Sequence, residues 1–211
     1  MKIKLVFFDC DGVLTHDGWS KLIEVVKISE ELNEKHLRDH FEGKLTHQQW
    51  AKLTEKFYKE SGLKADDLKK LYRKIKINPE AFGLIKYLHK KKVPVAIISF
   101  GLDYYVKKIA KELRIPVWRA YSSFVFDAKG NFKKIKLENN DKKEQAVREI
   151  CDSFRIKPTE TIFIGDSISD IGPFKLTKHG VLYQSKYEDQ ELKKYAWKKI
   201  KNLSEVKKLL D

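Results

Sequence analysis

Cysteine is scarce in this chain: only Cys10 and Cys151 occur among its 211 residues. The two do not form a Cys-x-x-Cys pair, and no cluster of histidine and cysteine suggests a zinc site. Cys10 follows an apolar run that is typical of a strand, where alternation turns its side chain away from those of its two neighbours. We therefore interpret both cysteines as thiols packed in a core.

Long apolar stretches are also missing. No uninterrupted run is long enough to span a bilayer. The first eight residues carry two lysines and only a short apolar run before acidic residues follow, which is unlike a signal peptide. There is no internal repeat and no low-complexity segment. We expect a cytoplasmic protein without a membrane partner, a monomer or homodimer, with one sizeable domain or one domain carrying a smaller insert.

Lysine, in contrast, is abundant, and the formal net charge is +14. One interpretation is a nucleic-acid-binding surface. The other is the solvated helical surface of a heat-adapted, thermophilic protein. The lysine doublets are scattered among acidic residues, and no helix-turn-helix, RNA-recognition or zinc-finger signature accompanies them, so we expect no nucleic-acid partner. A positive field still favours anionic, phosphorylated substrates.

Strand-like apolar runs alternate with helical patterns along most of the chain. We expect strands at residues 3–8, 93–99, 116–121, 161–166 and 180–183, and a hairpin over residues 124–132. We expect helices at residues 79–90, 104–113, 143–154, 170–177 and 204–210. Between about residues 19 and 75 the pattern is helical, without a convincing strand. The alternation predicts a parallel sheet with helices on both faces, and a helical insert after the first strand.

Three predicted strands end at a polar side chain, namely Asp9, Ser99 and Asp166. The carboxyl ends of parallel strands meet at one edge of the sheet, and this edge is where ligands bind in such folds. The sequence therefore predicts a functional site at this edge.

Two pairs of carboxylates fit phosphate chemistry. Asp9 and Asp11 are two residues apart at a strand end, so their side chains can lie on one face. One carboxylate of such a pair can attack phosphorus while the other shuttles a proton. Gly12 then allows a sharp exit from the strand. Asp166 and Asp170, four apart at a strand-to-helix turn, can bind Mg²⁺ directly or through water.

Hydroxyl and lysine side chains can hold a phosphoryl group. Ser99 is followed by Phe100 and Gly101, and a small hydroxyl with nearby backbone N–H groups can bind phosphoryl oxygens. A lysine at the start of a later amphipathic helix, either Lys142 or Lys143, can neutralise phosphoryl charge.

In this order the motifs resemble those of the haloacid dehalogenase-like (HAD) hydrolase superfamily, and within it the phosphoserine phosphatase-like branch. The resemblance covers nearly the whole chain and is carried by four segments: Asp9-Cys10-Asp11-Gly12-Val13-Leu14-Thr15, Ser99, Lys143, and Gly165-Asp166 with Asp170. Lys143 is preferred to Lys142 because the apolar residues after it then fall where the family's helix has its apolar face.

The resemblance implies an α/β fold with a Rossmann-like, three-layer, parallel-sheet core formed by residues 1–15 and 76–211. A small α-helical cap domain, residues 16–75, would be inserted after the first strand. It also implies a Mg²⁺-dependent phosphatase, a phosphoric monoester hydrolase acting on a small phosphorylated substrate. A phosphomutase of the same superfamily and a nucleic-acid-directed role are the alternatives.

The family's mechanism assigns roles to the motif residues. Asp9 would attack the phosphate monoester to form an aspartyl-phosphate, and Asp11 would act first as acid and then as base. Mg²⁺ would be held by Asp9, by the backbone carbonyl of Asp11 and by Asp166, with Asp170 in or near its coordination shell. The substrate's phosphoryl group would be bound by Ser99, Phe100, Gly101 and Lys143.

The predicted cap departs from phosphoserine-specific members. Those members carry a glutamate shortly after the first motif and an arginine in the cap, which together recognise the amino acid. Here the first stretch is His16-Asp17-Gly18-Trp19, no arginine lies between Arg38 and Arg73, and Thr54 stands at the best-matching position. We therefore expect free phosphoserine to be a poor substrate. Candidate pocket-lining side chains are His16, Trp19, His47 and Trp50, although Trp50 also suits packing inside the cap.

Overall fold

A seven-stranded sheet forms the centre of the structure, a computed structural model that describes residues 2–15, 18–27, 29–42, 44–138, 142–184 and 190–210. The strand order is β4-β3-β2-β1-β5-β6-β7, and all neighbours are parallel except β3 and β4. The strands are β1 (Leu5–Phe8), β2 (Val95–Leu102), β3 (Val117–Phe126), β4 (Phe132–Leu137), β5 (Thr161–Gly165), β6 (Gly180–Tyr183) and β7 (Lys198–Ile200). The predicted α/β class is confirmed.

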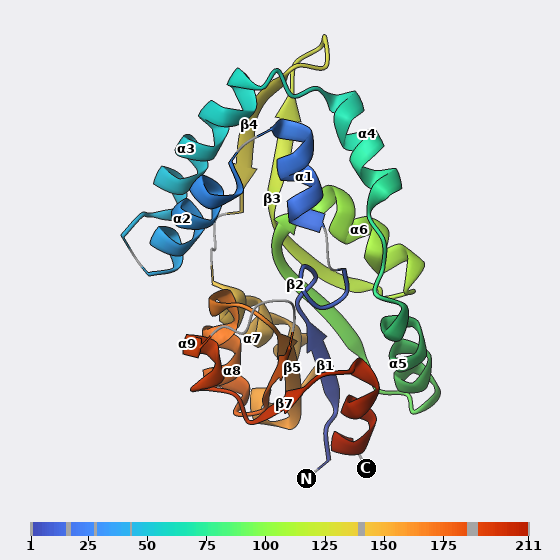
Figure 1. Cartoon of the computed structure of the whole chain (residues 1–211). Coiled ribbons are helices and arrows are strands. Elements are labelled where there is room, and N and C mark those ends of the chain that lie inside the picture. The colour runs from blue at the N-terminus through green and yellow to red at the C-terminus, as the bar shows by residue number, and fades with distance from the viewer. Residues whose placement is uncertain are drawn as a thin grey trace.

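Helices cover both faces of this sheet (Figure 1). One face packs against α5 (Pro79–Lys90), α6 (Asp103–Glu112) and the 3-10 helix η3 (Leu203–Leu209). The other packs against α7 (Lys143–Phe154), α8 (Ile171–Thr177) and α9 (Gln190–Lys193). Two further 3-10 turns are η1 (Pro158–Glu160) and η2 (Ile168–Asp170).

The central strand β1 is apolar throughout because it is buried on both faces. Val6 and Phe8 join the hydrophobic cluster on the α5 side, whereas Leu5 and Phe7 join the cluster on the α7 side. A strand covered on both faces has a continuous apolar sequence, and this made β1 predictable. Cys10 and Cys151 are buried within these clusters, as predicted.

The insert after β1 is helical, as predicted, within the part of the chain that the structure describes. Its helices lie beyond the carboxyl end of β1 (Figure 1) and are α1 (Gly18–Val26), α2 (Glu30–Phe41), α3 (His47–Glu60) and α4 (Ala65–Lys74). The hairpin of β3 and β4 reaches up among them. Tyr58 of α3 packs on Phe124 and Phe132 of this hairpin, with ring centroids 5.0 and 5.4 Å away.

The sequence predicted two separate segments where the structure has the single strand β3. It is one ten-residue strand whose first half pairs in parallel with β2 and whose second half pairs antiparallel with β4. Strand β2 also runs past Ser99 to Leu102, with a shift of register between these two residues. Ser99 therefore lies inside a strand rather than at its end.

The C-terminal region was predicted least well. The short strand β7 and helix α9 were not predicted, because they are only three and four residues long and rich in lysine or polar side chains. The predicted last helix is a 3-10 helix. Among the described residues, no helix has the length and apolar character needed to cross a membrane.

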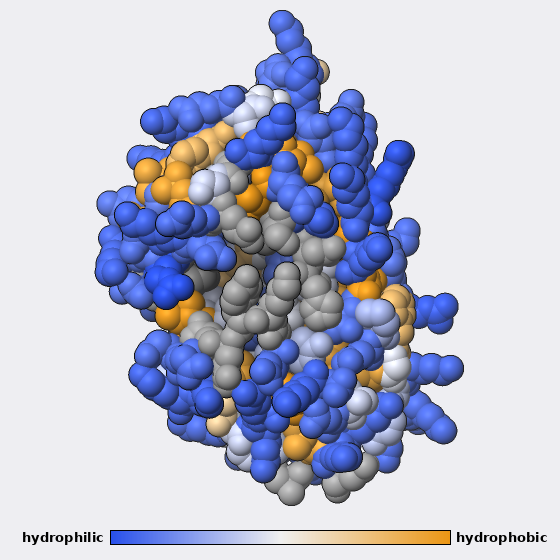
Figure 2. Space-filling model, viewed as in Figure 1, coloured by the Kyte–Doolittle hydropathy of each residue, from blue (hydrophilic) through white to orange (hydrophobic). Residues whose placement is uncertain are grey.

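The exposed lysines are spread over the molecule. Exposed pairs occur on α4, at the end of α5, on β4 and on β7. The face in Figure 2 is mostly hydrophilic, with smaller apolar patches between the polar side chains. This distribution matches a solvated surface better than one concentrated basic patch.

The two segments that lead into and out of the insert are fastened together. The Thr15 hydroxyl donates to the Lys76 carbonyl at 2.8 Å, and the Asn78 side-chain amide donates to the Val13 carbonyl at 3.0 Å and to the Tyr183 hydroxyl at 3.2 Å. The Asn78 side chain also caps α5 by accepting from the backbone N–H of Glu80 at 3.1 Å. One buried side chain thus joins the base of the insert to the sheet.

Asn78→Ala is expected to lower the free energy of unfolding by about 2 kcal/mol, because it removes a helix cap and the side-chain donor to the Val13 carbonyl. Urea denaturation of both proteins measures the difference. Asn131→Ala is the control, since Asn131 is exposed and bonds Asp127 in a surface turn. An Asn78→Ala loss no larger than that of the control would contradict this account of the junction.

Candidate active site

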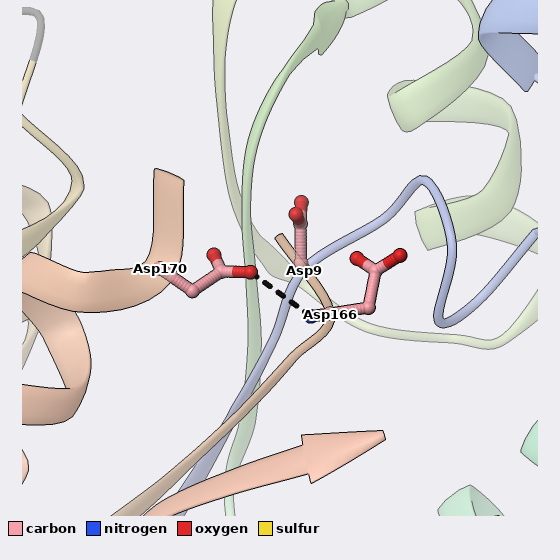
Figure 3. A group of neighbouring side chains, drawn as sticks. All are labelled: Asp9, Asp166 and Asp170. Atoms are coloured by element: carbon pink, nitrogen blue, oxygen red, sulfur yellow. Dashed lines mark hydrogen bonds between the residues drawn. The ribbon is translucent and has the colours of Figure 1, made fainter. Parts of the chain in front are cut away.

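Neighbouring strands bring three carboxylates together. Asp9 directly follows β1 and Asp166 directly follows β5, and the Asp9 backbone N–H donates to the Ile164 carbonyl at 2.8 Å. Asp170 lies one turn after Asp166. Oxygen atoms of Asp9, Asp166 and Asp170 lie within 4.8 Å of one another (Figure 3). Hard carboxylate oxygens of this kind suit a divalent cation such as Mg²⁺.

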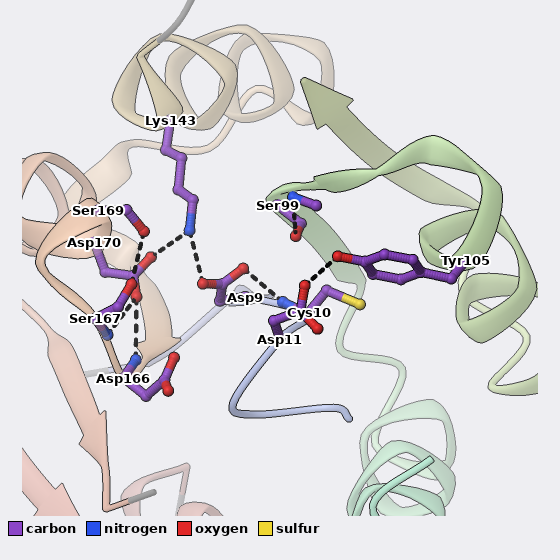
Figure 4. Close-up of polar contacts among 11 residues, drawn as sticks. Asp9, Cys10, Asp11, Ser99, Tyr105, Lys143, Asp166, Ser167, Ser169 and Asp170 are labelled. Carbon is purple, nitrogen blue, oxygen red and sulfur yellow. Dashed lines mark hydrogen bonds and ion pairs between the residues drawn. The ribbon is translucent and has the colours of Figure 1, made fainter. Parts of the chain in front are cut away.

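Lys143 joins two of these carboxylates. Its side chain is 1% exposed, and its Nζ lies 2.8 Å from Asp9 Oδ2 and 2.7 Å from Asp170 Oδ1 (Figure 4). Burial alone would lower the pKa of Lys143, but the charges of Asp170 and Asp9 outweigh burial and raise it, so the ammonium stays charged. Lys142, the other candidate, is exposed before the first turn of α7. The structure therefore brings Lys143, and not Lys142, to Asp9.

Both oxygens of Asp170 are already engaged. Oδ1 accepts from Lys143, while Oδ2 accepts from the backbone N–H groups of Asp166 at 3.1 Å and Ser167 at 3.2 Å. Burial raises the pKa of Asp170, and the ammonium of Lys143 opposes that rise. These bonds hold the loop that carries Asp166. Asp9 is engaged in the same way, because its Oδ1 accepts from the Cys10 backbone N–H at 2.6 Å and its Oδ2 from Lys143 at 2.8 Å.

Gly12 makes room for Asp166. Its φ of +76° is a conformation that side chains rarely adopt, and a Cβ there would lie 1.8 Å from Asp166 Oδ2. The glycine is thus required both by the backbone turn after Asp11 and by the close carboxylate. The sharp exit predicted from the sequence is present, but the contact with Asp166 was not predictable.

Asp11 points to a different partner. The hydroxyl of Tyr105, on α6, donates a hydrogen bond to Asp11 Oδ2 (Figure 4). Burial, followed by the charge of Asp11, raises the pKa of Tyr105 well above its usual value, so the phenol stays protonated and acts as donor. Sequence reasoning missed Tyr105, because nothing local marks a tyrosine that meets a residue 94 positions earlier in the chain.

Ser99 and the two residues after it, Phe100 and Gly101, line the same site. Ser99 is buried, and its Oγ accepts from the Gly101 backbone N–H at 3.0 Å. The Ser99 hydroxyl is directed toward the Asp9–Asp11 segment in Figure 4. The ring of Phe100 lies 5.3 Å from Lys143 Nζ and 5.1 Å from the ring of Tyr121. Phe100 therefore gives the lysine an aromatic neighbour.

The predicted specificity residues are only partly visible. His16 and Asp17 lie outside the described residues, as do the side chains of Trp19 and His47. Trp50 is buried in the main hydrophobic cluster, which agrees with packing inside the insert.

Comparisons with known proteins agree with this geometry. The family model described as haloacid dehalogenase-like hydrolase matches residues 3–176. A phosphoserine phosphatase of Methanocaldococcus jannaschii is 29% identical over 176 residues, which are 82% of this chain and 82% of that protein. A phosphoserine phosphatase of Idiomarina loihiensis is 23% identical over 197 residues, 91% of this chain and 87% of that protein.

Solved structures share the fold. A substrate-bound phosphoserine phosphatase complex superposes with a TM-score of 0.83 at 22% identity, and the match covers 100% of both chains. A phospho-aspartyl intermediate analogue of phosphoserine phosphatase gives the same TM-score of 0.83 at 23% identity, again over 100% of both chains. The predicted class of enzyme, a phosphoric monoester hydrolase, is confirmed by these matches together. Because the family model covers most of the chain, the protein belongs to the haloacid dehalogenase-like hydrolases, in the branch that resembles phosphoserine phosphatases.

Proposed function

We propose that this protein is a Mg²⁺-dependent phosphatase that hydrolyses small phosphate monoesters through an aspartyl-phosphate on Asp9. One observation carries the proposal: the buried Asp9 carboxylate is held by Lys143 at 2.8 Å, with Asp166 beside it at the carboxyl edge of the sheet. A fixed carboxylate, a fixed cation and a second carboxylate are the groups that in-line phosphoryl transfer requires.

The reaction divides into two steps. An Asp9 carboxylate oxygen attacks phosphorus, the ester P–O bond breaks, and Asp11 gives its proton to the departing alkoxide. Asp11 then takes a proton from water, which attacks the phosphorus of the aspartyl-phosphate, releases inorganic phosphate and restores Asp9. Lys143 and Ser99 bind phosphoryl oxygens during both steps, and Lys143 offsets their charge.

The donor groups fit a magnesium ion. Asp9 and Asp166 would bind it with carboxylate oxygens, and Asp11 with its backbone carbonyl, while Asp170 orients Lys143 and the Asp166 loop. When bound, such an ion neutralises charge on the phosphoryl oxygens and orients them. The small monoester substrate itself would be attracted by the net charge of +14.

We propose that residues 16–75 act as the cap and that residues 1–15 and 76–211 form the core. The position of α1 to α4 beyond the strand ends supports this division (Figure 1). The core's β3–β4 hairpin is tied to the insert by backbone bonds from Phe132 to Leu63 and from Ala65 to Gly130, each 2.9 Å. The hairpin would therefore move with the cap.

The proposed substrate is not phosphoserine, although the similar proteins bear that name. Thr54 stands where phosphoserine-specific members would place an arginine, and its side chain is buried. Its hydroxyl donates to the Trp50 carbonyl at 2.9 Å, within its own helix. A short side chain engaged in this way offers no positive charge to a substrate carboxylate.

Asp9→Asn is expected to reduce phosphate release by at least about 10³-fold, because the amide is a poor nucleophile. A panel of phosphate monoesters assayed with Mg²⁺ and with a chelator measures both the substitution and the metal dependence. Including sugar phosphates tests the mutase alternative, since a mutase releases little free phosphate. Asp152→Asn, on the exposed surface of α7, is the control and should leave activity unchanged. Activity that survives Asp9→Asn would overturn the mechanism.

Phosphoserine should be turned over with a kcat/KM at least about 10-fold below that of the best substrate in the panel, because one missing charged contact costs this much or more. The comparison needs the native protein only. Efficient and selective hydrolysis of phosphoserine would refute the specificity argument and leave the reaction class intact.

Lys143→Met is expected to abolish activity and to lower the free energy of unfolding by about 3 kcal/mol, because Asp9 and Asp170 lose the cation that balances them in the interior. Activity assays measure the first effect. Urea denaturation in the presence of a chelator measures the second. Lys142→Met is the matched control, since Lys142 is the neighbouring lysine and its side chain is exposed. Equal losses in both variants would argue against a special role for Lys143.

A further inference from the structure

We propose that Tyr105 is a positioning residue for the general acid and base: its hydroxyl holds one oxygen of Asp11 and thereby fixes how the carboxylate faces the leaving group. This inference rests on the proposed function, in which Asp11 moves the proton in both steps. Tyr105 itself transfers no proton.

The contact is built into the core. Tyr105 is near the start of α6, which follows directly from the strand that carries Ser99. Its side chain is 0% exposed, and its hydroxyl donates to Asp11 Oδ2 (Figure 4). The packed ring cannot swing aside without opening a cavity, so the hydroxyl stays where the fold places it.

Two glycines leave the space that this contact needs. A Cβ at Gly101 would lie 2.0 Å from the Tyr105 hydroxyl and 2.9 Å from Asp11 Oδ2. A Cβ at Gly18, the first residue of α1, would lie 2.3 Å from Asp11 Oδ1. Any side chain at either position would displace the carboxylate or the phenol. Asp11 is therefore enclosed by three separate elements, and the tyrosine supplies the directional bond.

Fixing one oxygen fixes the other. A carboxylate turns about its Cβ–Cγ bond unless a hydrogen bond holds it, and proton transfer in the transition state depends on this direction. The bond to Oδ2 opposes that rotation, so the whole carboxylate keeps one orientation. The geometry thus prepares Asp11 before substrate arrives.

Tyr105→Phe tests the role with two substrates. One is the alkyl phosphate that the native enzyme hydrolyses fastest in the panel, whose leaving group needs a proton. The other is p-nitrophenyl phosphate, whose leaving group departs as a stable anion. For the alkyl phosphate, kcat should fall about 10- to 100-fold with KM little changed, as expected for loss of part of the acid–base contribution.

With p-nitrophenyl phosphate the two steps should separate. The first needs no proton and should stay fast, while hydrolysis of the aspartyl-phosphate still needs Asp11 and should slow. Stopped-flow measurement should therefore show a burst of nitrophenolate in Tyr105→Phe that is larger, relative to the steady rate, than in the native enzyme. If the role of Tyr105 were merely structural, Tyr105→Phe would lower the rates for both substrates by the same factor and produce no such burst.

Tyr104→Phe is the matched control, because Tyr104 is the neighbour on the same helix, is 36% exposed and packs against Tyr72. It should behave as the native protein does. Equal rates for Tyr105→Phe and the native enzyme, or a uniform loss without a burst, would overturn the inference. Should Tyr105→Phe fail to fold, Gly101→Ala pushes the same contact apart and must show the same contrast between substrates. If the native protein hydrolyses no phosphate monoester, the proposed function fails instead, so the two failures are distinguishable.

Discussion

A lysine ammonium buried between two carboxylates is the interaction on which the rest of this site depends. Removing three charges from water costs several kcal/mol for each ion, and only close, well-oriented contacts offset that cost. Lys143 meets this condition with contacts of 2.8 and 2.7 Å to Asp9 and Asp170. Asp170 in turn holds the loop that carries Asp166, because its Oδ2 accepts hydrogen bonds from the backbone N–H groups of Asp166 and Ser167. The position of Asp9 and the shape of the loop that carries Asp166 therefore depend on one cation.

The sheet supplies the second constraint. β1 lies between β2 and β5, so residues that follow or interrupt these three strands meet at one edge. The same crowding explains the glycines. Gly12 faces the Asp166 carboxylate, and Gly101 faces the contact between Tyr105 and Asp11. Each leaves room for these side chains because it has no side chain of its own. Polar side chains can approach the backbone this closely only where the residue beside them has no Cβ atom.

Under the proposed function, the reaction and the choice of substrate would reside in different parts of the fold. The chain shares its architecture with phosphoserine phosphatase structures at a TM-score of 0.83, but a shared fold does not by itself determine the function of its site. Under the proposed function, selectivity would depend on side chains that the insert and its partner hairpin present to the site. There Thr54 is turned into its own helix, and Tyr58 packs on the hairpin. A conserved architecture is thus compatible with a different substrate.

The sequence by itself determined the order of the elements and the main chemical groups. Strands buried on both faces are continuous apolar runs, and Asp9 and Asp166 follow two of them, so fold class and acidic edge could be read locally. Local patterns could not show that β3 is one strand serving two partners, or that β7 closes the sheet. These depend on pairing with distant segments rather than on their own composition.

Tertiary structure alone decided how the groups meet. Lys143 reaches Asp9 across 134 positions of sequence, and Tyr105 reaches Asp11 across 94. Helical phase favoured Lys143 over Lys142, but only the packing of α7 against the sheet buries one ammonium and exposes the other. No periodicity identified Tyr105. A contact between distant residues follows from the way the layers pack, and that information resides in the folded chain as a whole rather than in any segment of it.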